Sequence, residues 1–527
     1  MTHLINSKSI IDQLHSQYQV ECVISIEELE QSSSSFLYKK LIPLYQSSYS
    51  SQQRFVFVNS APVDRKTLDH VIATLNYIDI SPYFILVVTN QESTATYFRS
   101  LPGPITVIES LEQTDHVQHN VLKTKPLFNT DNKMCAHVWA GLHVNPGGTT
   151  KFCCEYLDMI KDEQGNSYNI KNTPIEIILN SEYVKKVKQQ FRQGTTPDAC
   201  RRCSTKESLG ADSKRSLTPY KLKNIYGNID WESDTADSLG WIGGHLGNVC
   251  NLKCRMCSEI YSSTIAAEKI KFSTFKNKKQ DPVYAAFSNS WKNYIEEFYS
   301  DLKKLVPRIK NFEFSGGEPL MMQENLDFMQ YLIDAGHSED CIFEFLTNGT
   351  KYPDVFNQSH LFKRLSITLS IDNLGKRFEY ERSGSDWNTV ERNIEKFIER
   401  KNSCSSMEIG VNITVSIQNV YYLPELVTWL IEKGVSHYHY NRLDQPNWLA
   451  LKMLTPDAKK MVLEKLLSAD LSQSDQIKLA SIIQEIENVT PSDGQLFCEE
   501  MKKLDLIRSE SFNLTHPEIA QAMGYML

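Results

Sequence analysis

The feature that most restricts the fold is a regular alternation of short apolar runs and amphipathic stretches between residues 238 and 470. The stretches between the runs, such as 324–335 and 388–400, carry apolar residues at helical spacing. Six such units in a row predict a parallel sheet with right-handed crossovers, a TIM-like barrel that is either a partial (βα)6 barrel or a full one. In such folds the active site gathers at the carboxyl ends of the strands. The expected strands are 240–246, 311–315, 342–346, 364–371, 408–415 and 437–443.

The rest of the 527 residues provides further domains. Residues 1–125 predict a small N-terminal α/β domain of unknown role, with strands at 54–58, 83–89 and 105–108 and a helix over 63–80, but without a glycine-rich phosphate loop. Residues 131–225 are rich in turns and cysteines, which predicts a small domain built around a metal centre. Residues 471–527 predict a C-terminal helical segment, clearest at 477–486.

Composition excludes several classes of protein. The formal charge of −8 argues against nucleic acid as a partner, and the longest apolar run is far shorter than a membrane span. The first residues lack a secretion signal, so we expect a cytoplasmic protein with no membrane partner.

Twelve cysteines in a cytosolic chain indicate metal or iron–sulfur ligation where they cluster. Cys22, Cys341, Cys404 and Cys498 stand alone and are expected to be small buried side chains.

The tightest cysteine cluster follows the first barrel strand. Cys250, Cys254 and Cys257 provide three thiolates within eight residues, spaced C-x3-C-x2-C. A structural zinc site would want a fourth ligand close by, and this stretch has none. Three thiolates on a 4Fe–4S cube leave one iron open to a small chelating molecule. A chance cluster or a zinc knuckle is the alternative.

This loop resembles that of the radical S-adenosylmethionine (SAM) enzymes, and further matches follow the next strands in order. The resemblance covers about 230 residues and implies a 4Fe–4S cluster held by the three cysteines, with SAM bound beside it. The implied SAM contacts come from a GGEP segment, a TNG turn, an S-x-D element and a Y-x-R element. They are Gly316, Gly317 and Glu318 for the methionyl amine, Thr347 for the adenosine, Ser370 and Asp372 for the ribose, and Arg382 for the carboxylate.

Two positions depart from the superfamily. Met256 stands where an aromatic residue often packs on the adenine, although a thioether can make a similar contact. Segment 410–415 lacks the glycine-rich fifth-strand pattern, so no ligand is assigned there. No catalytic acid or base is chosen, so the catalytic residues are unknown.

A second, looser cysteine group precedes the barrel. The spacing C-x12-G-x4-C, completed by a C-x2-C pair, resembles the twitch form of the SPASM auxiliary domain and implies a second 4Fe–4S cluster in an N-terminal auxiliary domain. A zinc site with four thiolates is the alternative, because ligand count does not separate the two metals. Cys154, His137 and His143 are interpreted as structural. The implied cluster ligands are Cys135, Cys153, Cys200 and Cys203.

The resemblance implies an enzyme that reductively cleaves SAM to a 5′-deoxyadenosyl radical, which abstracts hydrogen from a C–H bond. Partners would be an external one-electron donor, such as flavodoxin or ferredoxin, and a substrate. Known relatives act on peptides, amino sugars and nucleotide-derived precursors; the extra N-terminal domain favours a peptide or protein. The alternatives are radical oxidation or rearrangement of a sugar or nucleotide-derived molecule, and a non-catalytic metal-binding scaffold.

Overall fold

The computed structural model describes residues 134–208, 213–221, 223–273, 280 and 295–525, together with four strands in the first 133 residues. The chain divides into two compact units, and each is described by itself. The smaller unit comprises residues 1–134 and 200–219, and the larger comprises 135–199 and 220–527. Among the described residues, no helix is both long and apolar enough to cross a membrane.

The smaller unit contains a parallel four-stranded sheet in the order β1-β2-β3-β4. Three strands coincide with the expected ones, whereas β1 was not expected because its four residues follow a polar stretch and are too short to show a period. The expected helix at 63–80 lies outside the described residues. Its strands are β1 (Cys22–Ser25), β2 (Phe55–Asn59), β3 (Ile85–Thr89) and β4 (Thr106–Ile108). The later segment of this unit, 200–219, begins at the end of the 3-10 helix η3 (Asp198–Cys200) and contains α10 (Arg201–Ser208) and most of α11 (Lys214–Lys221).

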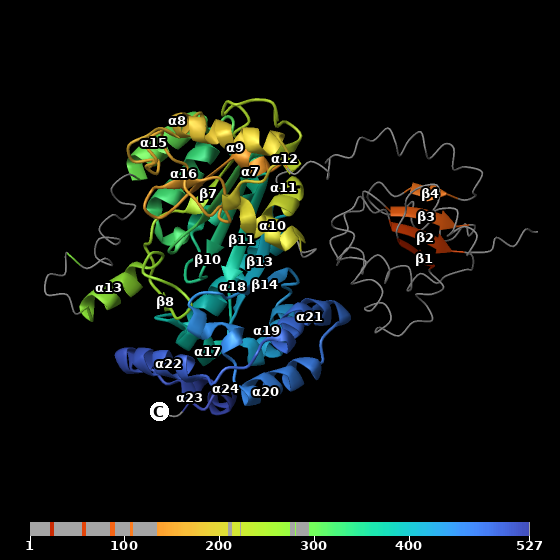
Figure 1. Ribbon diagram of the computed structural model, residues 1–527, viewed down its shortest axis with the longest axis vertical. Helices are drawn as coiled ribbons and strands as arrows, with labels where there is room; N and C mark the ends of the chain where they lie inside the picture. The colour runs from red at the N-terminus through yellow and green to blue at the C-terminus, as the bar shows by residue number, and fades with distance from the viewer. Residues whose placement is uncertain are drawn as a thin grey trace, which may run out of the picture. The chain divides into compact units, whose positions relative to one another are not determined.

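The larger unit is built on an eight-stranded sheet in the order β14-β13-β11-β10-β9-β7-β5-β6, flanked by helices (Figure 1). Six of these strands lie within one or two residues of the expected positions, and all pairs among them are parallel. They are β7 (Trp241–His245), β9 (Asn311–Ser315), β10 (Ile342–Thr347), β11 (Arg364–Ser370), β13 (Met407–Val415) and β14 (Tyr438–Arg442).

The sheet continues beyond β7 with two strands from the cysteine-rich segment. β5 (Gly141–Val144) pairs in parallel with β7, and β6 (Thr150–Lys151) returns antiparallel to β5. The intervening turn contains Gly148 at φ +81°, a conformation that favours glycine. The glycine of the C-x12-G-x4-C spacing therefore lies in the turn of a hairpin, and this hairpin extends the sheet of the larger unit.

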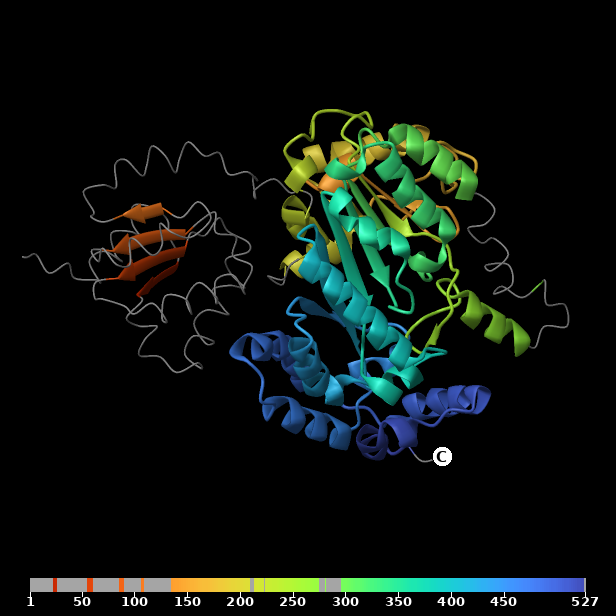
Figure 2. The same cartoon turned by 180° about the vertical axis from the view of Figure 1, so that it is seen from behind.

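Helices connect these strands and follow the last one (Figure 2). Those before and between the sheet strands are α7 (Ala136–Ala140), α8 (Ile175–Leu179), α9 (Glu182–Arg192), α12 (Lys223–Tyr226), α13 (Ser263–Lys271), α15 (Ile295–Leu305), α16 (Gln323–Asp334), α17 (Gly375–Glu381), α18 (Trp387–Ser403) and α19 (Leu423–Glu432). The segment in which C-terminal helices were expected contains α21 (Gln473–Asn488), α22 (Gln495–Arg508), α23 (Phe512–Thr515) and α24 (Pro517–Ala522), which follow α20 (Pro456–Leu467).

The two faces of the sheet differ in chemistry. One face buries a phenylalanine cluster, in which Phe314 and Phe345 alternate along their strands with polar residues of the opposite face. On that opposite face Glu313, Glu344 and Glu408 stand in one row, because Glu344 pairs with Glu313 on one side and with Ser366 on the other. These residues are half-buried or exposed, so the larger unit presents an open polar surface beneath the strand ends.

Candidate iron–sulfur and SAM site

The three-cysteine loop leaves the carboxyl end of β7 and ends in a short two-stranded ribbon. Its second cysteine lies in β8 (Lys253–Cys254), which pairs antiparallel with β12 (Arg382–Ser383). Ser263, at the start of α13, fixes the first cysteine, because its Oγ accepts from the Cys250 N–H and donates to the Cys250 carbonyl, both at 3.2 Å. A turn closes between the last two cysteines, with the Cys257 N–H donating to the Cys254 carbonyl at 3.1 Å.

The glycine pair after β9 is required by the cysteine loop itself. A Cβ on Gly317 would lie 2.2 Å from the Val249 carbonyl oxygen, and one on Gly316 would lie 2.9 Å from the Gly247 carbonyl oxygen. The two backbone segments lie this close because hydrogen bonds join them. The Gly317 N–H donates to the Gly247 carbonyl at 3.2 Å, and the Glu318 N–H donates to the Val249 carbonyl at 2.7 Å. The two motifs, about seventy residues apart, therefore pack backbone against backbone.

Glu318 links the second and third strand ends. Its side chain is fully buried and accepts three hydrogen bonds, from the Leu320 N–H at 3.0 Å, the Thr347 hydroxyl at 2.7 Å and the Asn348 N–H at 2.7 Å. Burial raises the pKa of this carboxyl, while the three donors oppose that shift. Both carboxylate oxygens of Glu318 already accept hydrogen bonds from the protein. The backbone of the GGEP segment is therefore better placed than this side chain to contact SAM.

The TNG turn is joined to the cysteine loop as well as to Glu318. The Asn348 side chain donates to the Asn251 side-chain oxygen at 3.1 Å, and Asn251 in turn donates to the Thr350 hydroxyl at 3.1 Å. Asn251 stands between the first two cysteines. The loop, the GGEP segment and the TNG turn thus form one connected hydrogen-bond network.

Arg382 lies against the second cysteine. Strand pairing puts it opposite Cys254, and its Nη1 lies 3.6 Å from the Cys254 Sγ, while its Nη2 lies 2.5 Å from Asp372 Oδ2. Burial opposes the charge, but Asp372 and Cys254 outweigh it and raise the pKa of this guanidinium. The residues implied for the SAM ribose and carboxylate therefore form a buried ion pair with each other, directly beside an implied cluster ligand.

Ser370 ends β11 and is half-buried; Asn412 of β13 lies directly opposite it in the sheet register. Asn412 is 8% exposed, and its Oδ1 accepts no hydrogen bond from the residues that the structure describes. A buried acceptor without a donor suits a bound hydroxyl or amine. Sequence reasoning assigned no ligand to this strand; the available signal was one amide side chain within an apolar strand.

The donor set fits an iron–sulfur cluster. Burial raises the pKa of both Cys250 and Cys257 to about 12, so without metal these thiols stay protonated at neutral pH. Donors already point at the sulfurs, because the Leu252 N–H lies 3.5 Å from the Cys250 Sγ in addition to the Arg382 contact. Such N–H groups stabilise thiolates and tune cluster potentials. No group of three or more His, Cys, Asp or Glu side chains within the described residues could hold a single metal ion.

The second cysteine group is divided between the two units. Cys135 and Cys153 are buried in the larger unit, whereas Cys200 and Cys203 belong to the smaller one, so their joint ligation stays a prediction. His137 and His143 are buried; the ring centroids of His137 and Trp241 lie 4.6 Å apart and those of His143 and Trp241 6.4 Å apart, consistent with packing side chains. Of the isolated cysteines, Cys341 and Cys404 are buried and Cys498 is partly so; the Cys22 side chain is outside the described residues.

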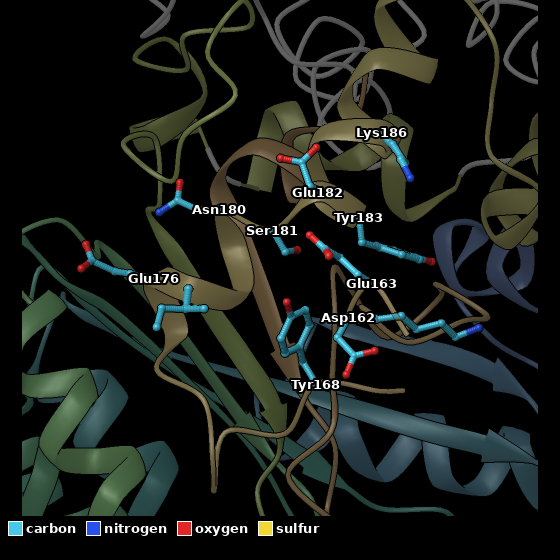
Figure 3. A pocket seen from close by; sticks show the side chains of 11 residues that line it. Asp162, Glu163, Tyr168, Glu176, Asn180, Ser181, Glu182, Tyr183 and Lys186 are labelled. Atoms are coloured by element: carbon cyan, nitrogen blue, oxygen red, sulfur yellow. The ribbon is translucent and has the colours of Figure 1, made fainter. Parts of the chain in front are cut away.

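A cavity of about 560 Å³ lies within residues 161–186 of the larger unit. Glu163, Tyr168 and Ser181 turn toward this hollow (Figure 3). None of the implied cluster or SAM residues lines it, so it is separate from the site formed by the cysteine loop.

Residues 245–418 match the Radical SAM superfamily, and the segment spans the cysteine loop and the strand ends described above. The chain carries a radical SAM domain. Residues 135–204 match the iron–sulfur cluster-binding domain called SPASM. The radical SAM domain brings a 4Fe–4S cluster and SAM as cofactors, and the SPASM domain brings an additional iron–sulfur cluster, which disfavours the zinc alternative. The description of the auxiliary domain as N-terminal was wrong, since the match begins at residue 135 and the domain is internal.

A search of curated proteins found no match to this chain. Among solved structures, the chain is similar to anSMEcpe with bound AdoMet at 18% identity and a TM-score of 0.29, covering 43% of this chain and 59% of that one. It is also similar to SuiB of Streptococcus suis bound to S-adenosylmethionine at 13% identity and a TM-score of 0.30, covering 64% and 70%. SuiB bound to the precursor peptide SuiA gives 12% identity, 61% and 64% coverage and a TM-score of 0.28. The chain thus spans less than two thirds of anSMEcpe.

Proposed function

We propose that the protein is a radical SAM enzyme whose Cys250, Cys254 and Cys257 hold the SAM-binding cluster. The observation that carries this proposal is the hydrogen-bond network joining the cysteine loop to the GGEP and TNG segments. Three elements far apart in sequence build one surface at the carboxyl ends of parallel strands, where ligands of such sheets bind. The strand order supports a partial (βα)6 barrel as the frame.

The reduced cluster, when bound, supplies the electron that splits SAM into methionine and a 5′-deoxyadenosyl radical, which takes hydrogen from a C–H bond. The chain's own residues orient SAM. We assign the backbone of Gly316 and Gly317 and the Arg382 guanidinium to the amino and carboxylate groups, and Ser370 and Asn412 to the ribose side. Thr347, Glu318 and Asp372 are assigned to holding these groups in place, because their polar atoms bond within the protein.

We propose a peptide or protein as the substrate. The polar face of the sheet carries Glu313, Glu344 and Glu408 in one row, half-buried or exposed, which offers a polypeptide a wide polar surface. The further sheet of the smaller unit, β1-β2-β3-β4, also supports this choice, because an additional domain can bind the leader of a peptide or a protein carrier. A sugar or nucleotide-derived substrate would need only the region beside SAM and is the second candidate. An external one-electron donor is required in either case.

The test is anaerobic reconstitution followed by iron counting and incubation with dithionite and SAM. The proposal expects about eight irons per chain, for two 4Fe–4S clusters, and release of 5′-deoxyadenosine. About four irons with one zinc would preserve the enzyme but overturn the auxiliary iron–sulfur cluster. A fully loaded protein that leaves SAM intact would overturn the enzyme in favour of a metal-binding scaffold.

Cysteine variants separate the two clusters. Replacing Cys250, Cys254 and Cys257 with Ala should abolish SAM cleavage and remove about four irons. Replacing Cys200 and Cys203 with Ala should remove the auxiliary cluster while SAM is still cleaved. Cys341→Ala is the matched control, because this buried thiol lies outside both groups and should leave both iron content and cleavage unchanged.

A further inference from the structure

Arg255, which directly follows the second cysteine of the loop, contacts the C-terminal helices. The Arg255 side chain is completely buried, and its Nη2 lies 2.7 Å from Asp505 Oδ1 and 2.6 Å from Glu510 Oε2. Asp505 belongs to α22 and Glu510 follows that helix, some 250 residues further along the chain. A buried guanidinium of this kind persists only where its partners are fixed.

The partners of Arg255 are fixed by a second layer of contacts. The guanidinium stacks on the Tyr380 ring at 3.7 Å, and its Nε donates to the Tyr380 carbonyl at 3.2 Å. Asp505 also accepts hydrogen bonds from the Tyr380 hydroxyl at 2.6 Å and the Tyr525 hydroxyl at 2.7 Å. The carboxylate is therefore held by neutral donors as well as by the arginine, which fixes the position of Arg255.

The same C-terminal segment contacts the ribbon that carries Cys254. The Arg508 guanidinium donates to the Lys253 carbonyl at 2.8 Å in β8, and Glu510 accepts from the Ser383 hydroxyl at 2.6 Å in β12. Both strands of the ribbon are thus anchored from outside the radical SAM domain match, which ends at residue 418. In both views α22 lies at the end of the larger unit that holds α17 and β8 (Figures 1 and 2).

We propose that the segment 495–525, the C-terminal clasp, positions the cluster-binding loop through Arg255, Asp505 and Glu510. The inference rests on the proposed function, since it assumes that Cys254 and Cys257 ligate the cluster. Fixing Arg255 fixes the turn between these two thiolates, and fixing the ribbon keeps Arg382 opposite Cys254, where it donates to the sulfur. A loosened clasp would therefore weaken both cluster retention and the hydrogen bond that tunes the cluster.

The test follows iron release from the reconstituted full-length protein to the chelator bathophenanthroline, together with the EPR spectrum of the reduced protein with and without SAM. Glu510→Gln removes one charge while keeping the shape. The triple variant Arg255→Met, Asp505→Asn, Glu510→Gln removes the whole charged group without leaving a buried charge unpaired. The kinetic phase of iron release that comes from the loop cluster is identified as the phase that disappears when Cys250, Cys254 and Cys257 are replaced with Ala.

We expect the triple variant to release the loop cluster about ten times faster or more, as is typical when outer partners of metal ligands are lost. Glu510→Gln should show a smaller increase, and both should alter the SAM-dependent EPR signal. Arg255→Lys, which keeps the charge, should retain most of the wild-type SAM-dependent EPR signal. Arg308→Gln, which breaks an ion pair with Glu176 of 2.6 Å outside the clasp, is the control and should behave as wild type.

Two failures are distinguishable. If the Glu510→Gln and triple variants fold but show unchanged rates of iron release and unchanged EPR signals, the proposed role of the C-terminal clasp is overturned. The proposed function as a radical SAM enzyme is not affected by that result. If the triple variant does not fold, an unchanged rate of iron release and an unchanged SAM-dependent EPR signal in Glu510→Gln would overturn the proposal equally. A wild-type protein without any SAM-sensitive cluster signal would instead overturn the proposed function on which the clasp rests.

Discussion

Replacing Gly317 with Ala should disable the cluster-binding loop without unfolding the protein. The new Cβ would lie 2.2 Å from the Val249 carbonyl oxygen and 2.7 Å from its carbon, so the loop backbone must move by about 1 Å to reach an ordinary contact. Overpacking of this kind costs about 1–3 kcal/mol. The same movement breaks the 2.7 Å hydrogen bond from the Glu318 N–H to Val249, worth about 1 kcal/mol.

Together these terms amount to roughly 2–4 kcal/mol against the cluster-competent loop, a factor of about thirty or more in its population. The assay is iron content after anaerobic reconstitution, combined with SAM binding by equilibrium dialysis. Gly227→Ala is the matched control, since no atom lies within 4 Å of its added Cβ. Near-normal retention of the loop cluster and unchanged SAM affinity in Gly317→Ala would refute the claim that the cysteine loop requires a glycine at this position to pack against it.

Two further predictions concern buried charges. Arg382→Gln combined with Asp372→Asn should lower the midpoint potential of the loop cluster by about 40 mV or more, because a donor worth about 1 kcal/mol to the sulfur of Cys254 is lost; an unchanged potential in an EPR-monitored titration would contradict it. Burial raises the pKa of Glu381 to about 7, so the folded chain keeps a proton that the unfolded chain has released between about pH 4.5 and 7. The contribution of Glu381 to stability is therefore lost as pH rises through that window, by up to about 3 kcal/mol, and urea unfolding should show wild type losing this much relative to Glu381→Gln. A pH-independent difference between the two proteins would show that this carboxyl does not carry the shift.

The strands of the larger unit were predictable because their pattern is local. Buried parallel strands appear as short apolar runs between helical stretches, and 311–315 coincides with β9 to the residue. The order of these six strands in the sheet also follows from their order in the chain. The joining of β5 and β6 to the same sheet was not predictable, because their runs are four and two residues long and carry no measurable period.

The site was predicted at the level of motifs, while its internal contacts were not. The sequence indicated that Glu318, Asp372 and Arg382 lie near bound SAM, but not that Asp372 pairs with Arg382 or that Glu318 is saturated by protein donors. Such contacts depend on side-chain geometry between elements distant in sequence. The Arg255 anchor escaped prediction for the same reason, because its partners lie some 250 residues away and nothing local distinguishes an arginine that is buried.

The most direct test of the account asks whether SAM coordinates a cluster held by three thiolates. Electron–nuclear double resonance on the reduced protein, with SAM labelled by 15N at its amino group, reports that bond. The account predicts a hyperfine coupling between the labelled nitrogen and the cluster, lost when Cys250, Cys254 and Cys257 are replaced with Ala. A well-loaded, reduced wild-type protein with no such coupling in the presence of excess SAM would contradict the central claim.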